Sequence, residues 1–165
     1  MLVGILIGGF IILIFGIVGA VMIYKYFQEK KEAEKSQSWP STSGSIPKSF
    51  MRHEVSYESG NTLYYPNVEY DYEVLGTAYT GNRINFGGST GNSNRKKSEE
   101  ILTQYPLGKN VPVYYDSNNP EDAVLEREIG VGGTVFLVVG LLFILIILCA
   151  LCISTIIAGS MLVGY

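Results

Sequence analysis

The sequence has little of the chemistry on which enzyme active sites most often depend. It contains one histidine, His53, and two cysteines, Cys149 and Cys152, which both lie in an apolar run toward the C-terminal end. The polar central segment therefore offers no cysteine nucleophile, and no Ser-His-Asp set or group of metal ligands can be assembled around His53. We expect no catalytic residue, no metal and no cofactor, and we interpret the chain as a non-enzyme.

The sequence also lacks a surplus of basic residues. Its 12 Lys and Arg residues are outnumbered by 15 Asp and Glu residues, which gives a net charge of −3 at pH 7. General binding of nucleic acid needs a broad basic surface, so nucleic acid is not an expected partner. The two cysteines stand three positions apart, a spacing that disfavours a disulfide on one helix, and two thiols do not complete a metal site.

Two polar segments resemble ligand-binding loops but lack an essential part of each. Residues 87–98 are rich in Gly, Ser and Asn, yet they contain no Gly-Lys pair, which a phosphate-binding loop requires. Residues 116–122 gather oxygen ligands without the glycine and the distal glutamate of a calcium-binding EF-hand. We interpret the first segment as a connecting loop and the second as a turn.

Charge is absent from two long apolar runs, residues 2–24 and 129–165. At about 1.5 Å per residue the first run measures about 35 Å as a helix, enough to cross a hydrocarbon core of about 30 Å. A cleaved signal peptide fits it poorly, because no basic region precedes the run and no small-residue cleavage site follows it. The second run predicts one tilted helix. We therefore expect transmembrane helices at 1–27 and 129–165.

Small residues recur in both runs, and in lipid such residues let two helices approach closely. The candidates for helix packing in the first run are Gly4, Gly8, Gly16 and Ala20. Glycine also marks the second run, at Gly130, Gly133 and Gly140. The expected contact lies either between the two helices of one chain or with a partner.

Lysine and arginine near the two runs predict the orientation in the membrane. Lys25, Lys30, Lys31 and Lys35 follow the first run, Arg127 precedes the second, and neither terminal tail carries a basic residue. Because basic segments tend to stay in the cytoplasm, the central segment is expected to be cytoplasmic, with both termini outside. The expected location is the plasma (inner) membrane, in which the chain would be a multi-pass protein.

Between the two runs, a charged helical extension or linker at 28–38 is expected to lead into one soluble domain at 39–128. Residues 68–74 alternate between apolar and acidic side chains, which predicts a half-buried strand. Further strands are predicted at 50–57, 77–86, 111–115 and 123–125, and a short helix at 95–105. The predicted fold is α+β: two transmembrane helices flanking a small all-β, barrel-like domain with one short helix.

Short motifs follow one another in a set order through this central segment. They are Trp39-Pro40, Gly44-Ser45-Ile46, Tyr65-Pro66-Asn67-Val68-Glu69-Tyr70-Asp71-Tyr72, Gly76, Tyr79-Thr80-Gly81, Ile84-Asn85-Phe86, Tyr105-Pro106-Leu107-Gly108, Val111-Pro112-Val113-Tyr114-Tyr115-Asp116, Asn119-Pro120 and Ala123-Val124-Leu125-Glu126. In this the segment resembles the family called domain of unknown function 3592. The resemblance implies a small β domain flanked by membrane helices, and it implies no reaction. Ser117 departs from the proline that members often carry there, which bears on the geometry of that turn.

The remaining candidate residues are aromatic or basic and are candidates for interaction. Tyrosines on strands are expected to bury the ring and keep the hydroxyl in water, and an exposed subset can bind a peptide or another subunit. Trp39 is expected either to close the core or to lie at the membrane interface. The candidates are Trp39, Tyr70, Tyr72, Tyr114, Tyr115 and the basic trio Arg95, Lys96 and Lys97, which can reach anionic headgroups.

These observations favour a non-catalytic membrane protein. We expect an accessory, assembly or scaffolding subunit of a larger membrane complex, with membrane lipid and either other membrane subunits or a second copy of the chain as partners. The alternative is a membrane-tethered sensor or binding module for a small ligand, a lipid headgroup or a peptide. The two differ in a testable way, because a sensor is stabilised by its ligand.

Overall fold

The structure is a computed structural model that describes residues 2–55, 60–88 and 91–163, with side chains described between residues 8 and 155 of these ranges. The chain divides into two compact units. We call them the helical unit, Met1–Gln28 with Thr134–Tyr165, and the sheet unit, Glu29–Gly133. The predicted order of elements is confirmed: two apolar helices flank a β-sheet and a short helix.

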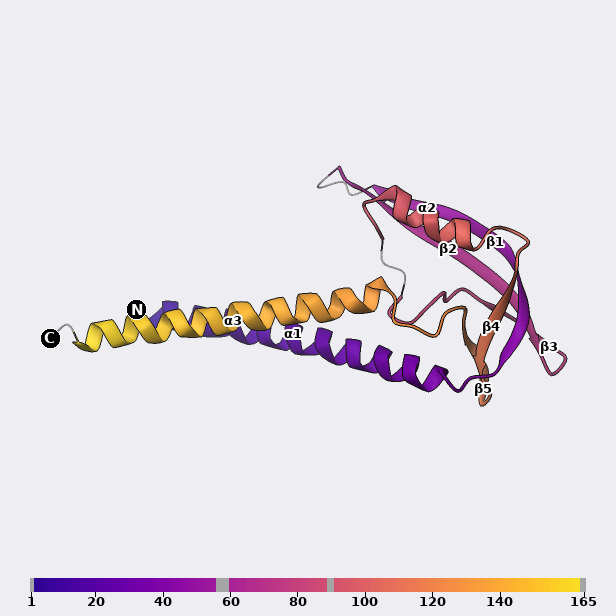
Figure 1. Ribbon diagram of the computed structural model, residues 1–165. Helices are drawn as coiled ribbons and strands as arrows, with labels where there is room; N and C mark the ends of the chain where they lie inside the picture. Colours follow the sequence, from indigo (N-terminus) through magenta and orange to yellow (C-terminus); the bar gives the residue numbers. More distant parts are fainter. Residues whose placement is uncertain (1, 56–59, 89–90, 164–165) are drawn as a thin grey trace. The chain divides into compact units, whose positions relative to one another are not determined.

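Figure 1 labels the elements along the chain. The helices are α1 (Leu2–Ser36), α2 (Arg95–Gln104) and α3 (Val131–Val163). The strands are β1 (Ser41–Val55), β2 (Thr62–Val74), β3 (Thr77–Gly81), β4 (Asn110–Asp116) and β5 (Asn119–Val124). The predicted linker is therefore helical up to Ser36, and α1 is one continuous helix.

The five strands form one antiparallel sheet in the order β3-β2-β1-β4-β5. β1 is the central strand, and it pairs with β2 from Gly44 to Val55. On its other side β1 pairs with β4 only from Ser41 to Ser45. β1 and β2 thus extend beyond the other strands as a two-stranded arm.

The predicted barrel is not shown, because the sheet is not closed between its edge strands β3 and β5. β3 ends at Gly81, and the irregular chain that follows it bonds to the chain that follows β5. Glu126 N donates to Ile84 O at 2.7 Å, and Phe86 N donates to Glu128 O at 3.0 Å. Side-chain and loop contacts therefore join the two edges where a barrel would have a ladder of strand hydrogen bonds.

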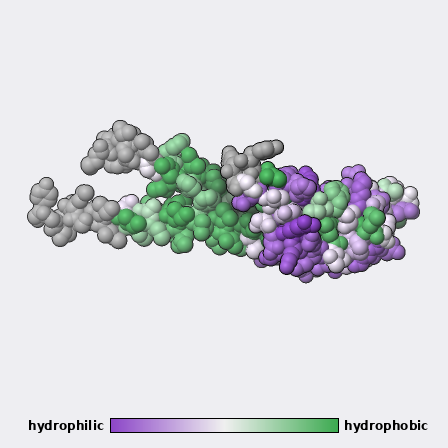
Figure 2. Space-filling model, turned by 90° about the horizontal axis from the view of Figure 1, so that it is seen from above, coloured by the Kyte–Doolittle hydropathy of each residue, from purple (hydrophilic) through white to green (hydrophobic). Residues whose placement is uncertain are grey.

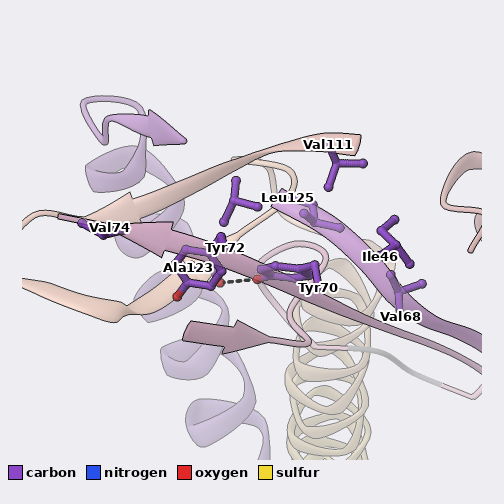
Figure 3. Packing of buried hydrophobic residues seen from close by; sticks show 9 residues of the cluster. Ile46, Val68, Tyr70, Tyr72, Val74, Val111, Ala123 and Leu125 are labelled. Atoms are coloured by element: carbon purple, nitrogen blue, oxygen red, sulfur yellow. Dashed lines mark hydrogen bonds between the residues drawn. The ribbon is translucent and has the colours of Figure 1, made fainter. Parts of the chain in front are cut away.

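The alternation predicted for residues 68–74 is confirmed. Val68, Tyr70, Tyr72 and Val74 are buried on one face of β2, whereas Asp71 and Glu73 are exposed on the other. The buried side chains pack against residues of β1, β4 and β5 in the main core (Figure 3). This cluster consists of Ile46, Val68, Tyr70, Tyr72, Val74, Val111, Val113, Ala123 and Leu125.

A second, smaller cluster joins the end of α1 to the sheet. It contains Ala33, Trp39, Phe86 and Val124, with the Trp39 and Phe86 rings edge to face at a centroid distance of 6.0 Å. Aromatic pairs in this arrangement contribute beyond the area that they bury. The last turns of α1 therefore belong to the core of the sheet unit.

Several of the predicted boundaries are wrong in detail. The strand predicted at 50–57 begins already at Ser41. The strand predicted at 77–86 ends at Gly81, and the turn predicted at 116–122 is shorter, because β5 already begins at Asn119. The connection between β2 and β3 consists of Leu75 and Gly76, both with positive φ, at 50° and 83°. Positive φ at both central positions is typical of the type I′ turn, which is favoured in two-residue hairpins because its twist matches the right-handed twist of the flanking strands.

Gly44 lies where β1 is flanked by β2 and β4, and it has no room for a side chain. A Cβ at this position would be 2.6 Å from Val113 Cγ2 and 2.8 Å from Asp71 O. One of these atoms belongs to a fully buried core valine and the other to the backbone of β2. Neither neighbour can move without disturbing the sheet.

We predict that Gly44→Ala destabilises the protein by about 1–3 kcal/mol through overpacking. Thermal unfolding of the full-length chain in detergent, followed by circular dichroism, measures the effect. Ser45→Ala is the matched control, because Ser45 is the exposed neighbour on the same strand. Equal melting temperatures for the two variants would contradict the packing described here.

Candidate interaction surfaces

The described surface of the helical unit is almost entirely apolar. Figure 2 shows this unit in green, whereas the sheet unit is mostly polar. By length and composition, two helices can cross a membrane, over Gly8–Ser36 and Val131–Thr155. Large side chains such as Phe10, Leu13 and Leu145 are more than half exposed. Side chains of this kind in such number are costly in water and favourable in lipid.

Within the helical unit, α1 and α3 meet at glycines. A Cβ on Gly19 would be 3.2 Å from Gly140 O and 3.3 Å from Phe143 Cβ. A Cβ on Gly140 would be 2.7 Å from Ile23 Cγ1 and 3.0 Å from Gly19 O. The two backbones are thus nearly in contact, and the rings of Phe15 and Phe143 pack beside them with centroids 5.1 Å apart.

The small residues singled out from the sequence lie at different places relative to this contact. A Cβ on Gly16 would be 3.6 Å from Ile147 Cδ1, so Gly16 faces α3. Gly8 has no described atom within 4 Å of its Cβ position, and Ala20 is exposed. The side-chain surroundings of Gly4 lie outside the described residues. Sequence reasoning missed Gly19. Its position three residues after Gly16 places both glycines on the same face of the helix, and this spacing could have indicated it.

The two ends of the sheet unit are bonded to each other. Gln37 Nε2 donates to Arg127 O at 2.6 Å, and Arg127 Nη1 donates to Gln37 O at 2.7 Å. The Arg127 guanidinium also lies over the Tyr114 ring, 4.2 Å from its centroid. We call this set of residues, Gln37, Tyr114 and Arg127, the junction.

Ionic contacts near the junction hold the end of α1. Lys35 Nζ donates to Asp116 Oδ2 at 2.5 Å, and Glu29 Oε2 accepts from Gly87 N at 2.9 Å. Asp116 is buried and also accepts from Asn118 N at 3.0 Å. The hydrogen bond from Lys35, followed by the one from Asn118, lowers the pKa of Asp116 below its ordinary value.

Tyr70 and Tyr72 lie in the core, and the expectation that their hydroxyls remain in water is wrong. Tyr70 Oη donates to Ala123 O at 2.9 Å and lies 3.0 Å from Arg83 O, and Tyr72 Oη donates to Pro120 O at 2.6 Å. Burial raises the pKa of Tyr70. These hydroxyls satisfy backbone carbonyls at the open edge of the sheet, so they join β2 to β5.

The other aromatic candidates are divided between the two clusters. Tyr115 packs against the main core, Tyr114 packs against the smaller cluster, and Trp39 is buried within the smaller one. All five aromatic candidates, Trp39 and the four tyrosines, therefore contribute to the packing of one cluster or the other.

The basic trio begins α2 and is exposed to solvent. Asn94 caps the helix by accepting from Lys96 N, and Arg95 pairs with Glu99 one turn later at 2.7 Å. Lys96 and Lys97 are exposed. Positive charge at a helix N-terminus opposes the helix dipole, so the trio does not stabilise α2 through that interaction.

Across residues 2–55, 60–88 and 91–163, no group of three or more His, Cys, Asp or Glu side chains could hold a metal ion. His53 is exposed on β1, and the two cysteines are exposed on α3. Two depressions in the described surface are shallow and open to solvent, one along β1 and β4 and one on the outer side of α2.

Comparison with known proteins identifies the central part of the chain. The model of a family described as a domain of unknown function (DUF3592) matches residues 41–130, which is more than half of the chain. The match covers all five strands and α2. No curated protein matches the sequence.

We predict that Gly140→Leu separates α1 from α3, because the side chain would displace the backbone of Gly19. Cysteines introduced at Phe15 and Phe143, in a chain with Cys149→Ala and Cys152→Ala, report the contact through crosslinking by a short bifunctional thiol reagent in lipid. Gly9→Leu is the matched control, because no described atom lies within 4 Å of its Cβ position. Undiminished crosslinking in the Gly140 variant would contradict the glycine contact.

We predict that Asp116→Asn lowers stability at neutral pH and reduces the loss of stability in acid. A carboxylate with a lowered pKa contributes stability above its unfolded-state pKa of about 4, and that contribution disappears as the pH falls through the lower folded-state value. Unfolding of the full-length chain between about pH 7 and pH 2 should therefore show the two stability curves converging in acid. Parallel curves would contradict the prediction, and Asp71→Asn, at an exposed carboxylate that accepts from Thr80, is the control.

Proposed function

We propose that this chain, which belongs to the DUF3592 family, is a non-catalytic membrane protein that acts as an accessory, assembly or scaffolding subunit of a larger membrane complex. The family is described as a domain of unknown function, so the proposal rests on the molecule itself. The observation that carries it is the close pairing of two apolar helices through glycine.

The register of the helix pair supports a shared span across a bilayer. Gly16 faces Ile147 and Gly19 faces Gly140 and Phe143, so the helices run antiparallel. Since each residue adds about 1.5 Å along the axis, Tyr24 is level with the turn of α3 around residue 137. Beyond this level the uncharged part of α1, residues 2–23, is about 22 residues long, or about 33 Å, which matches a hydrocarbon core, and α3 continues to Val163.

The residues that end this apolar stretch support the same boundary. Tyr24, Tyr26 and Phe27 form an aromatic group, and Tyr24 and Phe27 are more than half exposed. Tyrosine is enriched at membrane–water interfaces because its ring is apolar and its hydroxyl can reach water. Lys25 lies within this group, and the basic residues that follow it favour an orientation with the central segment in the cytoplasm of a multi-pass protein, for which we propose the plasma (inner) membrane.

The distribution of polar groups supports a binding role over a chemical one. Neither apolar helix stretch contains an ionisable side chain that would mark a transport pathway. In the sheet unit, buried Ser98 and Asp116 are used in internal bonds, Ser98 Oγ to Tyr64 O and Asp116 to Lys35, whereas the buried Trp39 Nε1 has no partner among the described residues. Contact with other subunits would then use the outer faces of the helices and the edge of the sheet.

We predict that the protein resists alkaline carbonate extraction from membranes and co-purifies with a different membrane protein in fixed stoichiometry. Crosslinking before extraction in mild detergent, followed by native mass determination, measures the composition of the complex. A variant with Gly9→Leu and one with Gly140→Leu separate the outer helix face from the internal contact. Recovery of the chain alone, or only with copies of itself, would contradict the accessory-subunit role.

A further inference from the structure

The arm formed by β1 and β2 has an uncovered edge. β4 leaves β1 after Ser45, and the chain before β4 bonds to β1 once more, at Ile46, through Gly108 N and Lys109 O. From Lys48 to Val55, β1 pairs with β2 on one side, and within the described residues no backbone group pairs with its other side. Unpaired strand edges bind other strands readily, and proteins normally block or use them.

The side chains along this edge alternate in a charged and apolar order. Lys48, Phe50, Arg52 and Glu54 share one face of β1 and are exposed. Their contacts within the chain leave them accessible. Lys48 bonds to Glu69 with 61% of its side chain exposed, and Arg52 pairs with Glu54 while both side chains stay more than half exposed. Phe50 is 46% exposed, a large area for an aromatic ring, and it lies on the part of β1 whose outer edge has no partner among the described residues.

This order is complementary to itself when the strand is reversed about Met51. We propose that the edge pairs with the same edge of a second copy of this chain, antiparallel and centred on Met51. Lys48 of one copy then lies opposite Glu54 of the other, and Phe50 lies opposite Arg52. Opposite charges and an arginine beside an aromatic ring are both favourable cross-strand neighbours.

The neighbouring registers on the same face are unfavourable, so the pattern selects this one. Pairing centred on Phe50 would place Lys48 opposite Arg52 of the other copy. Pairing centred on Arg52 would place that arginine opposite itself. Like charges directly opposite each other destabilise a strand pair. A lysine on an edge strand usually discourages pairing, whereas here the reversed strand offers it a glutamate.

The proposed assembly contains two copies only, because the β1 edge of each chain is occupied by the β1 edge of the other chain. A two-fold interface of this kind uses the same patch on both chains and does not grow into a filament. A single strand pair is a small interface, and confinement of both chains in one membrane would raise their effective concentration. In this one respect the inference draws on the proposed membrane role.

Disulfide crosslinking of the full-length chain in lipid nanodiscs or native membranes tests the pairing. The chain carries Cys149→Ala, Cys152→Ala and Met51→Cys, so that the two introduced thiols are directly opposite each other. Opposed residues of antiparallel strands have Cα atoms about 4.5–5.5 Å apart, within the range for a disulfide. We expect a covalent dimer on mild oxidation.

Ser43→Cys is the matched control for this experiment. Ser43 is exposed on the same strand, but its edge is occupied by Pro112 of β4. It should give no covalent dimer. Absence of the Met51→Cys dimer, or an equal yield from Ser43→Cys, would overturn the proposal.

Exchange of charge makes the test specific for the register. In the Met51→Cys chain, Lys48→Glu and Glu54→Lys should each abolish the dimer, because each places like charges opposite each other in both pairs. A mixture of the two variants should restore it as a heterodimer, in which both charge pairs are again opposite in sign. Failure of the mixture to crosslink, or crosslinking of either variant alone at the parental level, would overturn the register.

The mixture also separates pairing from folding. Lys48→Glu loses the bond to Glu69 in every chain that carries it, so recovery in the mixture shows that the variant is folded. A chain that dimerises through Met51→Cys but brings no other protein would contradict the accessory-subunit role and leave this inference intact. A heteromeric complex with one copy of the chain would support the accessory-subunit role and contradict the strand pairing proposed here.

Discussion

The reciprocal hydrogen bonds between Gln37 and Arg127 fix the two ends of the sheet unit together. The residues are 90 positions apart, and all five strands lie between them, so the contact joins the chain before the sheet to the chain after it. It brings the end of α1 beside the segment after β5, where Trp39 packs with Phe86 and Val124. The segments that lead into and out of the sheet therefore lie at neighbouring points of the sheet unit.

The tyrosines show how a residue type that suggests binding can be used for packing. Tyr70 and Tyr72 direct their hydroxyls to carbonyls of the opposite edge of the sheet. An unpaired carbonyl in the interior would cost about 1–3 kcal/mol, so a tyrosine that reaches it stabilises an edge that strand pairing leaves open. These side-chain hydrogen bonds therefore stabilise the sheet unit although its edge strands β3 and β5 do not pair to close a barrel.

Two separate surfaces remain for partners. The helical unit has glycines that pack internally, at Gly19 and Gly140, and an outer apolar surface on the same helices. The sheet unit has the uncovered edge of β1, with charges in an order that suits a reversed copy of itself. The first surface demands lipid or apolar helices, and the second demands a strand. In the scaffolding role proposed above, the two surfaces would join copies of the chain and other subunits at once.

The sequence by itself determined the two apolar helices, the half-buried strand of residues 68–74 and the family, because each depends on a local period or on the order of motifs. It did not determine the open sheet, the partner of Arg127 or the hydroxyl bonds of Tyr70, which depend on contacts between residues distant in the chain. Gly19 shows the same division. Glycine is frequent in membrane helices, so the sequence does not distinguish Gly19 from other glycines. Only the close approach of Gly140 on α3 shows why a side chain cannot be accommodated at Gly19.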